Sequence, residues 1–224
     1  MTNSPDISHN LDPYFLNSRT RFDLIELIPY TPKSVLEVGC GIGKTGKAIV
    51  DKYGSKVIGI DLSAEAIEVA KRQDCWEKLI VCDLDRTPIP MEIENYRFDC
   101  IMYPDVLEHL KSPWNIIKAH LDLLNPSGVM IASIPNIRHI YVMKDLLFKG
   151  NWTYTEMGIL DRTHLRFFTK KTMINLFEQA NLKVTCIKPR SFSGPSLLKS
   201  INRLNHHLLE EFLTVQYLIC ACRK

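Results

Sequence analysis

A short apolar segment that runs into three closely spaced glycines constrains the fold more than any other part of the chain. The segment is Ser34-Val-Leu-Glu-Val38, and Gly39, Gly41 and Gly43 follow it at alternate positions. A short apolar run before a turn signal predicts a buried strand. Glycine accepts backbone conformations that other residues avoid, so we expect the strand to turn sharply into a helix and to present backbone N–H groups to a ligand.

An acidic residue just before the turn indicates the kind of ligand. Glu37 stands two places before Gly39, and a carboxylate there favours a group with a positive charge. S-adenosylmethionine (SAM) carries a sulfonium and an ammonium group and no phosphate. The turn therefore points to a methyl donor before it points to a nucleotide.

Two phosphate-binding patterns overlap the same turn. Gly43-Lys-Thr45 resembles the end of a P-loop, but Val38 stands where that motif needs its first glycine, which excludes it. Gly41-Ile-Gly-Lys-Thr-Gly46 fits the dinucleotide pattern, and Asp61 follows at the distance expected of a ribose-binding carboxylate. Asp61 serves either cofactor, because both carry an adenosine ribose. Glu37 would lie poorly beside a pyrophosphate, so an NAD(P)-dependent oxidoreductase is the alternative and not the leading interpretation.

Strand-like and helix-like segments alternate along the chain. Strands with few polar positions are typical of a parallel sheet that is covered by helices on both faces. The predicted strands are 34–38, 56–61, 79–82, 97–103, 129–134, 182–187 and 214–222, and the predicted helices are 44–52, a helix capped by Ser63, 112–124 and 170–180 capped by Thr169. The pattern predicts a doubly wound α/β sheet with its ligand at the carboxyl ends of the strands.

Four acidic residues stand at the predicted strand ends. Glu37, Asp61 and Asp83 each end one of three successive strands, and Asp105 follows the fourth. At such a position Asp61 would accept hydrogen bonds from ribose hydroxyls and Asp83 from an adenine amino group. A single loop acid is usually just solvated, but four in register with strand ends indicate a site.

Four segments together resemble the class I SAM-dependent methyltransferases: Glu37–Gly43, Gly59–Ser63, Cys82–Leu84 and Phe98–Leu110, the last with Asp105-Val-Leu-Glu-His109. The resemblance covers roughly 33–182. It implies a Rossmann-like, seven-stranded, mostly parallel sheet that ends in an antiparallel hairpin. It also implies direct displacement of the SAM methyl group by an acceptor.

The same resemblance implies which residues bind the cofactor. Glu37 and the glycines would hold the methionine part, Asp61 the ribose, and Asp83 with Leu84 the adenine. Tyr103 replaces a small residue often found there, and we expect it to narrow the mouth near the methyl group. The full predicted set is Glu37, Gly39, Gly41, Gly43, Asp61, Leu62, Asp83, Leu84, Tyr103 and Asp105.

A second block resembles bacterial methyltransferases associated with surface-polysaccharide and glycan synthesis. It comprises Asn151-Trp-Thr-Tyr154 and Gly158–Thr169, after the fifth predicted strand, where an insertion would overhang the site. The predicted acceptor contacts are Tyr154, Asp161, Arg162 and Arg166. From 138 to 171 there are seven Lys and Arg and three Asp and Glu, which favours an anionic acceptor; a solvated surface explains that excess equally well.

A hydroxyl acceptor must lose its proton, and histidine is the residue that most often takes it. His164 is the first candidate because it lies between Asp161 and Arg166, and we expect Asp161 to orient its imidazole. His109 is the second candidate and His139 the third. O-methylation of a small-molecule or glycan-like acceptor is the predicted activity, and a non-catalytic SAM-binding regulatory module is the alternative outside enzymology.

The length of 224 residues fits one domain. We expect Pro13–Tyr30 to form an amphipathic covering helix within 1–32, and 136–169 and 189–212 to be insertions on the substrate side. Pro189–Phe212 has leucines near helical spacing and is expected to pack on its own domain, with a lid, a homodimer surface and a membrane-facing helix left open.

Charge and cysteine content exclude several classes of protein. A net charge of +3 is too small to indicate nucleic-acid binding. The polar N-terminus shows no signal peptide, and no apolar run approaches the roughly 18 residues of a membrane span, so a soluble cytoplasmic protein is expected. Seven cysteines without a C-x-x-C pair predict reduced thiols and no metal site.

Overall fold

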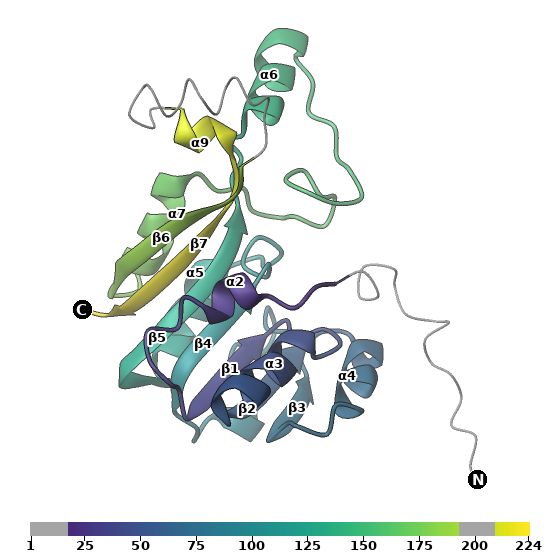
Figure 1. Cartoon of the computed structure of the whole chain (residues 1–224). Helices are drawn as coiled ribbons and strands as arrows, with labels where there is room; N and C mark the ends of the chain where they lie inside the picture. The colour runs from purple at the N-terminus through teal and green to yellow at the C-terminus, as the bar shows by residue number, and fades with distance from the viewer. Residues whose placement is uncertain (1–17, 193–208) are drawn as a thin grey trace.

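The computed structural model describes residues 18–192 and 209–224, and its centre is one seven-stranded sheet (Figure 1). The strands lie in the order β3-β2-β1-β4-β5-β7-β6. Their bounds are β1 Ser34–Val38, β2 Lys56–Asp61, β3 Lys78–Val81, β4 Phe98–Pro104, β5 Leu124–Pro135, β6 Leu182–Phe192 and β7 Thr214–Arg223. Only β7 runs antiparallel to its two neighbours, so the predicted mostly parallel sheet with a terminal antiparallel pair is confirmed.

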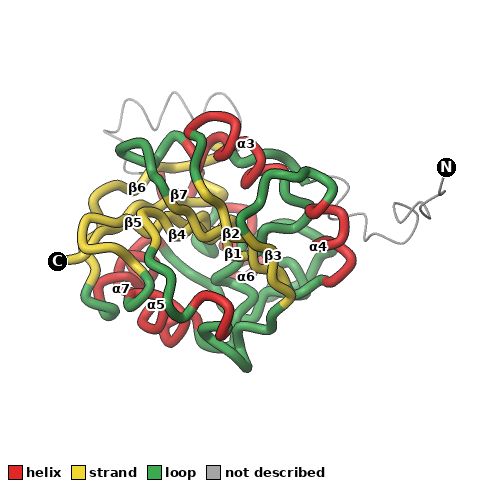
Figure 2. The backbone as a smooth tube through the Cα atoms, turned by 90° about the horizontal axis from the view of Figure 1, so that it is seen from below, coloured by secondary structure: helices red, strands yellow, loops and turns green. Residues whose placement is uncertain are grey.

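Helices cover both faces of the sheet, which gives three layers (Figure 2). The helices α3 (Lys44–Tyr53) and α4 (Ala64–Lys71) lie on one face, and α5 (Pro113–Leu121) and α7 (Lys170–Glu178) lie on the other. The short helix α2 (Phe22–Ile25) shares an apolar core with α3. A short 3-10 helix, η2 (Met91–Ile93), precedes β4. Two further helices, α6 (Ile140–Lys149) and α9 (Glu210–Leu213), lie beyond the carboxyl end of β5, at the top of Figure 1.

Alternate residues of the central strands belong to two separate apolar cores. Val35 of β1 packs in the core beneath α2 and α3, whereas its neighbour Leu36 packs in the core beneath α5 and α7. Both side chains are fully buried. Burial on both faces explains why the predicted strands read as almost continuous apolar runs.

Predicted helix caps agree with the structure. The Ser63 hydroxyl accepts a hydrogen bond from the backbone N–H of Ala66 at 3.1 Å. Thr169 forms a capping box with Thr172 at the start of α7. These caps fix where α4 and α7 leave the sheet edge.

The N-terminal covering helix is much shorter than predicted within the described residues. Only α2 is helical between residue 18 and Tyr30, and Phe15 lies outside the described residues. The backbone N–H of Arg21, which caps α2, donates to the Thr45 hydroxyl at 3.1 Å and so ties the segment to α3. Leu24 and Ile25 are nevertheless buried, so the segment covers the sheet as expected.

The predicted helical segment 189–212 agrees only in part where it is described: α9 makes 210–212 helical, whereas 189–192 are not. Residues 189–192 continue β6, because Pro189 and Arg190 pair with Tyr217 and Gln216 of β7. Residues 193–208 lie outside the described residues. Among the described helices, none combines the length and the apolar composition that a membrane crossing requires.

Candidate functional site

The predicted glycine turn lies between β1 and α3 and has a left-handed backbone. The φ angles of Gly39, Gly41 and Gly43 are +71°, +52° and +87°. The N–H groups of Gly39 and Cys40 donate to the Ile60 carbonyl at the end of β2. A Cβ on Gly39 would lie 2.4 Å from Val106 Cγ2, so the turn packs directly against the loop that follows β4.

Asp61, at the end of β2, organises the turn. Its Oδ2 accepts from the Gly41 N–H at 2.7 Å and its Oδ1 accepts from the Ser63 N–H at 2.9 Å. Each carboxylate oxygen keeps a lone pair for a further donor, such as a ribose hydroxyl. Burial raises the pKa of Asp61, and the two backbone N–H groups counteract that effect.

The other predicted adenosine contacts lie at the same sheet edge. Leu62 follows β2 and is 70% exposed, which leaves its side chain available for contact with a ligand. Asp83 follows β3, and its side chain is 39% exposed and lies 3.3 Å from Arg86 Nε. Leu84 is buried beneath this edge. The alignment of strand ends is therefore as predicted, whereas the role of each residue toward the cofactor stays a prediction.

Glu37 lies beneath the turn rather than open to it. Its side chain is 1% exposed and reaches the backbone N–H of Gly46 in α3. The second oxygen, Oε2, has no hydrogen-bond partner among the described residues. Burial raises the pKa of Glu37 to about 8, with the charge of Asp61 adding to it. An unpartnered buried carboxyl beside a tight glycine turn fits a cationic cofactor, because a nearby positive charge would stabilise its ionised form.

The expectation that Tyr103 narrows the cofactor mouth is wrong. Its side chain is fully buried in the core beneath α5 and α7. The hydroxyl lies 2.9 Å from Nδ1 of His120, and His120 Nε2 lies 2.7 Å from the Pro88 carbonyl. The alternation of β4 directs Tyr103 away from the turn, and the residue has a structural role instead.

A cavity of about 240 Å³ lies on the other side of the loop that follows β4. We call it the strand-end cavity. It is bounded by the ends of β4, β5, β6 and β7 and by the segment 157–164. The lining residues are Asp105, Glu108, His109, Pro135, Met157, Gly158, Ile159, Asp161, His164, Arg190, Val215 and Gln216.

The loop after β4 is hydrogen-bonded to the block that contributes residues 157–164 to the lining of this cavity. The Glu108 carbonyl accepts from the N–H groups of Leu165 and Arg166, at 2.8 and 2.9 Å. Arg166 Nε donates to the Lys111 carbonyl at 3.0 Å. These bonds join Glu108 and Lys111 of the loop to Leu165 and Arg166 of the block, so the two segments form one wall beside the strand ends.

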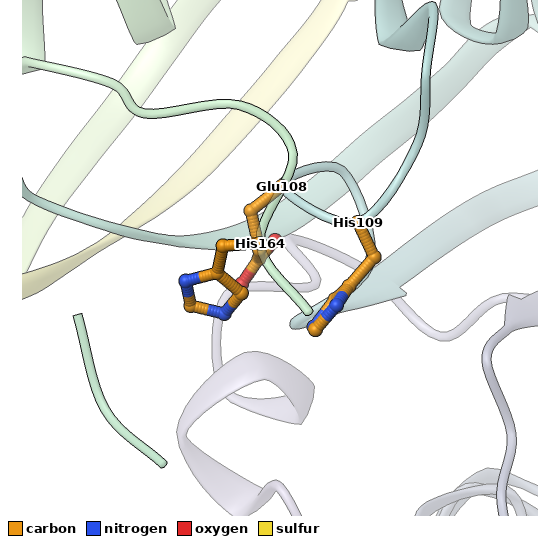
Figure 3. A group of neighbouring side chains, drawn as sticks. All are labelled: Glu108, His109 and His164. Atoms are coloured by element: carbon orange, nitrogen blue, oxygen red, sulfur yellow. The ribbon is translucent and has the colours of Figure 1, made fainter. Parts of the chain in front are cut away.

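Two predicted catalytic residues meet on this wall (Figure 3). The rings of His109 and His164 lie 4.7 Å apart between centroids, and the Glu108 side chain lies beside them. Burial and the neighbouring His164 lower the pKa of His109. Burial, with the charge of Asp105, raises the pKa of Glu108 well above its ordinary value. His139, the third candidate, is 2% exposed and is not part of the cavity lining.

Asp161 does not orient His164, contrary to expectation. Its Oδ1 accepts from the Thr163 N–H at 2.8 Å and from the Thr163 hydroxyl at 2.6 Å. Burial works against ionisation, but these bonds give Asp161 a lowered pKa. His164 Nδ1 is bonded to the Ile159 carbonyl at 3.0 Å instead.

Three predicted acceptor contacts do not line the cavity. Arg162 forms an ion pair with Glu156, and its side chain is 60% exposed. Arg166 is held by the Lys111 carbonyl, and its guanidinium lies 5.8 Å from the Trp114 ring. Tyr154 is 49% exposed and lies near Phe167. These three side chains either bind other protein groups or are exposed to solvent. Of the four predicted acceptor contacts, Asp161 alone lines the cavity.

A buried arginine that sequence reasoning missed connects the cavity to the N-terminal segment. Arg21 is 6% exposed and donates to the Ser133 hydroxyl at 3.0 Å and to the Asp105 carboxylate. Asp105 also accepts from the Ser133 hydroxyl at 2.9 Å and from the Gln216 amide. Both oxygens of the Asp105 carboxylate are therefore engaged by protein donors, and no sequence pattern marked Arg21 or Gln216.

Comparison with known proteins gives one family and several relatives. A family model described as "Methyltransferase domain" matches residues 14–187. A ubiquinone biosynthesis O-methyltransferase of Actinobacillus pleuropneumoniae serotype 7 is 30% identical over 177 residues, which cover 72% of this chain and 70% of that protein. A protein of the same name from Cereibacter sphaeroides is 31% identical over 202 residues, covering 90% and 78%.

Solved structures show the same fold at low identity. A SAM-dependent methyltransferase from Mesorhizobium loti superposes with a TM-score of 0.64 at 16% identity, covering 93% of this chain and 100% of that one. One from Archaeoglobus fulgidus has a TM-score of 0.63 at 17% identity, covering 89% and 91%.

Proposed function

The chain belongs to the methyltransferase domain family and is a SAM-dependent methyltransferase, and we propose that it methylates an oxygen atom of a small molecule held in the strand-end cavity. The observation that carries the proposal is the place of this cavity. Val106 touches the glycine turn on one side of the loop after β4, and Glu108 and His109 line the cavity on the other. One loop thus adjoins both the predicted cofactor site and a cavity that could hold an acceptor.

Two facts favour a small acceptor and oxygen as the reacting atom. The cavity of about 240 Å³ is smaller than the roughly 300–1,000 Å³ typical of ligand sites in proteins. The relatives that cover most of the chain carry the name ubiquinone biosynthesis O-methyltransferase. An aromatic hydroxyl compound is therefore the acceptor class to test first.

Different groups of residues would bind the cofactor, align the acceptor and remove its proton. SAM supplies a methyl group on a sulfonium, which is an activated leaving group. The glycine turn with Asp61 and Asp83 would hold it, and the loop after β4 would set the line of approach. The acceptor hydroxyl loses its proton as it is methylated, and the groups nearest to it would be His164, His109 and Glu108.

A glycan-like acceptor is the second candidate. Arg190 lines the cavity, and the 138–171 region has an excess of basic residues, which together suit a phosphate or carboxylate group. The names of the relatives do not point to glycans. A homodimer and a cytoplasmic location stay predictions.

Transfer of label from methyl-labelled SAM tests the proposal. Two acceptor sets, dihydroxylated benzoates and nucleotide sugars, are offered under equal conditions. We expect label on an oxygen of the phenolic compound. Label on nitrogen, or on nucleotide sugars alone, would contradict the proposal.

A cavity-filling variant locates the reaction. Val215→Phe should raise the acceptor KM about tenfold, the effect of roughly 1–2 kcal/mol of lost binding, and should leave SAM affinity unchanged. Leu165→Phe is the matched control, because its side chain is 45% exposed and does not line the cavity. Equal KM values for both variants would place the acceptor elsewhere.

A further inference from the structure

Trp76 packs against the glycine turn, although no sequence motif marks it. It stands in the connection between α4 and β3 and is partly buried against the core that α2 and α3 cover. Its Nε1 donates to the Ala70 carbonyl at 3.0 Å. The next residue, Glu77, donates its backbone N–H to the Val57 carbonyl of β2 at 2.9 Å. The indole is therefore held at two places, by the end of α4 and by β2.

Three glycines from different elements face the six-membered ring of this indole. A Cβ on Gly43, the last glycine of the turn, would lie 2.8 Å from Trp76 Cζ2. A Cβ on Gly46 of α3 would lie 2.6 Å from Cζ3, and a Cβ on Gly59 of β2 would lie 2.9 Å from the same atom. Carbon atoms that are not bonded pack at about 3.5–4.0 Å, so the ring leaves no room for a side chain at these positions. The turn, α3 and β2 therefore all rest on one side chain.

Two of these glycines also touch groups of the predicted cofactor site. The Cβ on Gly46 would lie 2.8 Å from Glu37 Oε2, and the Gly46 N–H is the group that the Glu37 side chain reaches. The Cβ on Gly59 would lie 2.8 Å from the Sγ of Cys40, which belongs to the turn. A single glycine thus separates the indole from the buried carboxyl, and another separates it from the turn itself.

The turn depends on its neighbours for its shape. Its three glycines have no side chains, so other residues must fill the space around it. Val106 contacts the turn at Gly39, and Trp76 contacts it at Gly43. Because protein interiors are close-packed, loss of the indole would leave a cavity into which the turn could move. A binding site that is no longer fixed in its bound shape must be ordered by the ligand, and this ordering weakens binding.

We infer that Trp76 is a positioning residue for the methyl donor: through Gly43, Gly46 and Gly59, its indole holds the glycine turn in the conformation that binds SAM. Trp76 acts through these glycines and is not itself a ligand of the cofactor. The inference deepens the proposed function at the cofactor site. It rests on SAM dependence, which the family shows, and not on the acceptor or on the strand-end cavity.

Calorimetric titration of SAM, without an acceptor, tests the inference. Trp76→Phe keeps an aromatic residue but removes the far ring atoms that face the glycines. We expect the SAM Kd of this variant to rise about tenfold, and that of Trp76→Leu at least as much. Trp152→Leu is the matched control, because it changes another partly buried tryptophan, whose ring lies 5.1 Å from that of Phe167 in the inserted block. Its SAM Kd should equal that of the native protein.

Hydrogen exchange separates a loosened turn from a general loss of stability. In the native chain the N–H groups of Gly39 and Cys40 are bonded to the Ile60 carbonyl, and the Gly43 N–H is bonded to the Cys40 carbonyl. These amides should exchange about tenfold faster in Trp76→Phe, because the turn opens locally. Phe177→Leu lowers stability from the other face of the sheet, where Phe177 is fully buried in the second core. It should leave both the exchange of the turn and the SAM Kd unchanged.

A second substitution should restore part of what the first removes. Gly46→Ala alone adds a methyl group that overlaps the indole and should weaken SAM binding. In the Trp76→Phe background the same methyl group fills the space that the far ring leaves. The double variant should therefore bind SAM more tightly than the product of the two separate losses predicts.

Three results would each overturn the inference. One is a native SAM Kd and native exchange of the turn in both Trp76→Phe and Trp76→Leu. Another is a loss of SAM affinity in Phe177→Leu as large as that in Trp76→Phe, because affinity would then follow overall stability. The third is a double variant whose loss equals the product of the separate losses. A native protein that binds no SAM would instead contradict methyl transfer itself, so the two failures are distinguishable.

Discussion

Glu37 makes the stability of the protein depend on pH through a single buried carboxyl. Its pKa is about 8 in the folded chain, against an ordinary value of 4.5. Between these values the folded state keeps the proton and the unfolded state has lost it. The folded state then binds more protons, so the free energy of unfolding falls as pH rises through this window and levels off above it.

Glu37→Gln should remove this dependence. From pH 4.5 to about 8 we expect the variant to gain stability relative to the native protein by up to about 1.4 kcal/mol per pH unit. Urea unfolding across this range measures it. Glu108 contributes the same trend to both proteins and cancels in the difference. Glu26→Gln changes an exposed carboxyl and is the control. If the free energy of unfolding depends on pH in the same way for the native protein and Glu37→Gln, Glu37 is ionised over the whole range and the prediction is wrong.

Tyr103 is buried and bonded to His120, so we expect it to stabilise the fold and not to contact the cofactor. Because His120 Nε2 donates to the Pro88 carbonyl, Nδ1 must accept the Tyr103 hydroxyl proton. Burial also lowers the pKa of His120 to about 4, which keeps the ring neutral. Tyr103→Phe should cost about 1–2 kcal/mol in urea unfolding and leave SAM affinity by calorimetry unchanged. Weaker SAM binding at unchanged stability would restore the original expectation.

The sequence predicted the place of an individual site residue only where a recognisable motif contains that residue. Asp61 and Asp83 were found because each ends a strand beside a recognisable turn. Arg21 was missed because an arginine in a polar N-terminal stretch reads as solvated, and its partners Ser133 and Gln216 lie in other strands. Glu108 was missed as a cavity residue because only the folded loop shows that its carboxyl is buried without a partner.

At the scale of elements, the glycine turn and the loop after β4 share one contact. Gly39→Ala adds a Cβ at a φ of +71° and 2.4 Å from Val106 Cγ2. We expect it to weaken SAM binding and to lower stability by more than the roughly 1–2 kcal/mol of left-handed strain alone. Gly54→Ala is the control for strain, because its φ is +66° and nothing lies within 4 Å.

Val106→Ala should relieve the clash and leave the strain. A double-mutant cycle on Gly39→Ala and Val106→Ala should therefore show a favourable coupling of about 0.5–3 kcal/mol. Additive effects in unfolding and in SAM binding would mean that the turn and the loop move independently. The loop would then not transmit the position of the cofactor to the strand-end cavity.

The strands were predictable as elements, whereas α6 was not. The strands are apolar runs buried on both faces, a pattern that sequence displays directly. In α6, Val142 is the only buried side chain, so the helix is not part of the packed core whose pattern the sequence analysis followed. Its exposed side chains include Leu147 at 67% and Phe148 at 82%. No side chain caps the N-terminus of α6, and the left-handed backbone of Gly150 ends the helix.

At the scale of the molecule, Arg21 joins the N-terminal segment to three strands. Its guanidinium contacts Asp105 after β4, Ser133 in β5 and Gln216 in β7. Arg21→Met should cost about 2–3 kcal/mol in urea unfolding, because it leaves the Asp105 carboxylate short of a charged donor. Arg72→Met changes an exposed arginine and should cost almost nothing. A similar small loss in both variants would show that the N-terminal segment does not brace the strand ends.

The sheet order has a consequence for how the chain is made. β7 follows β6 in sequence, yet it lies between β5 and β6. While the chain emerges from a ribosome, β6 lacks its neighbour in the sheet until β7 has been synthesised. The wall of the cavity formed by Val215 and Gln216 is also missing until then. The nascent chain must hold an exposed edge of β5 in the meantime, and chaperone contact during synthesis is most needed in that interval.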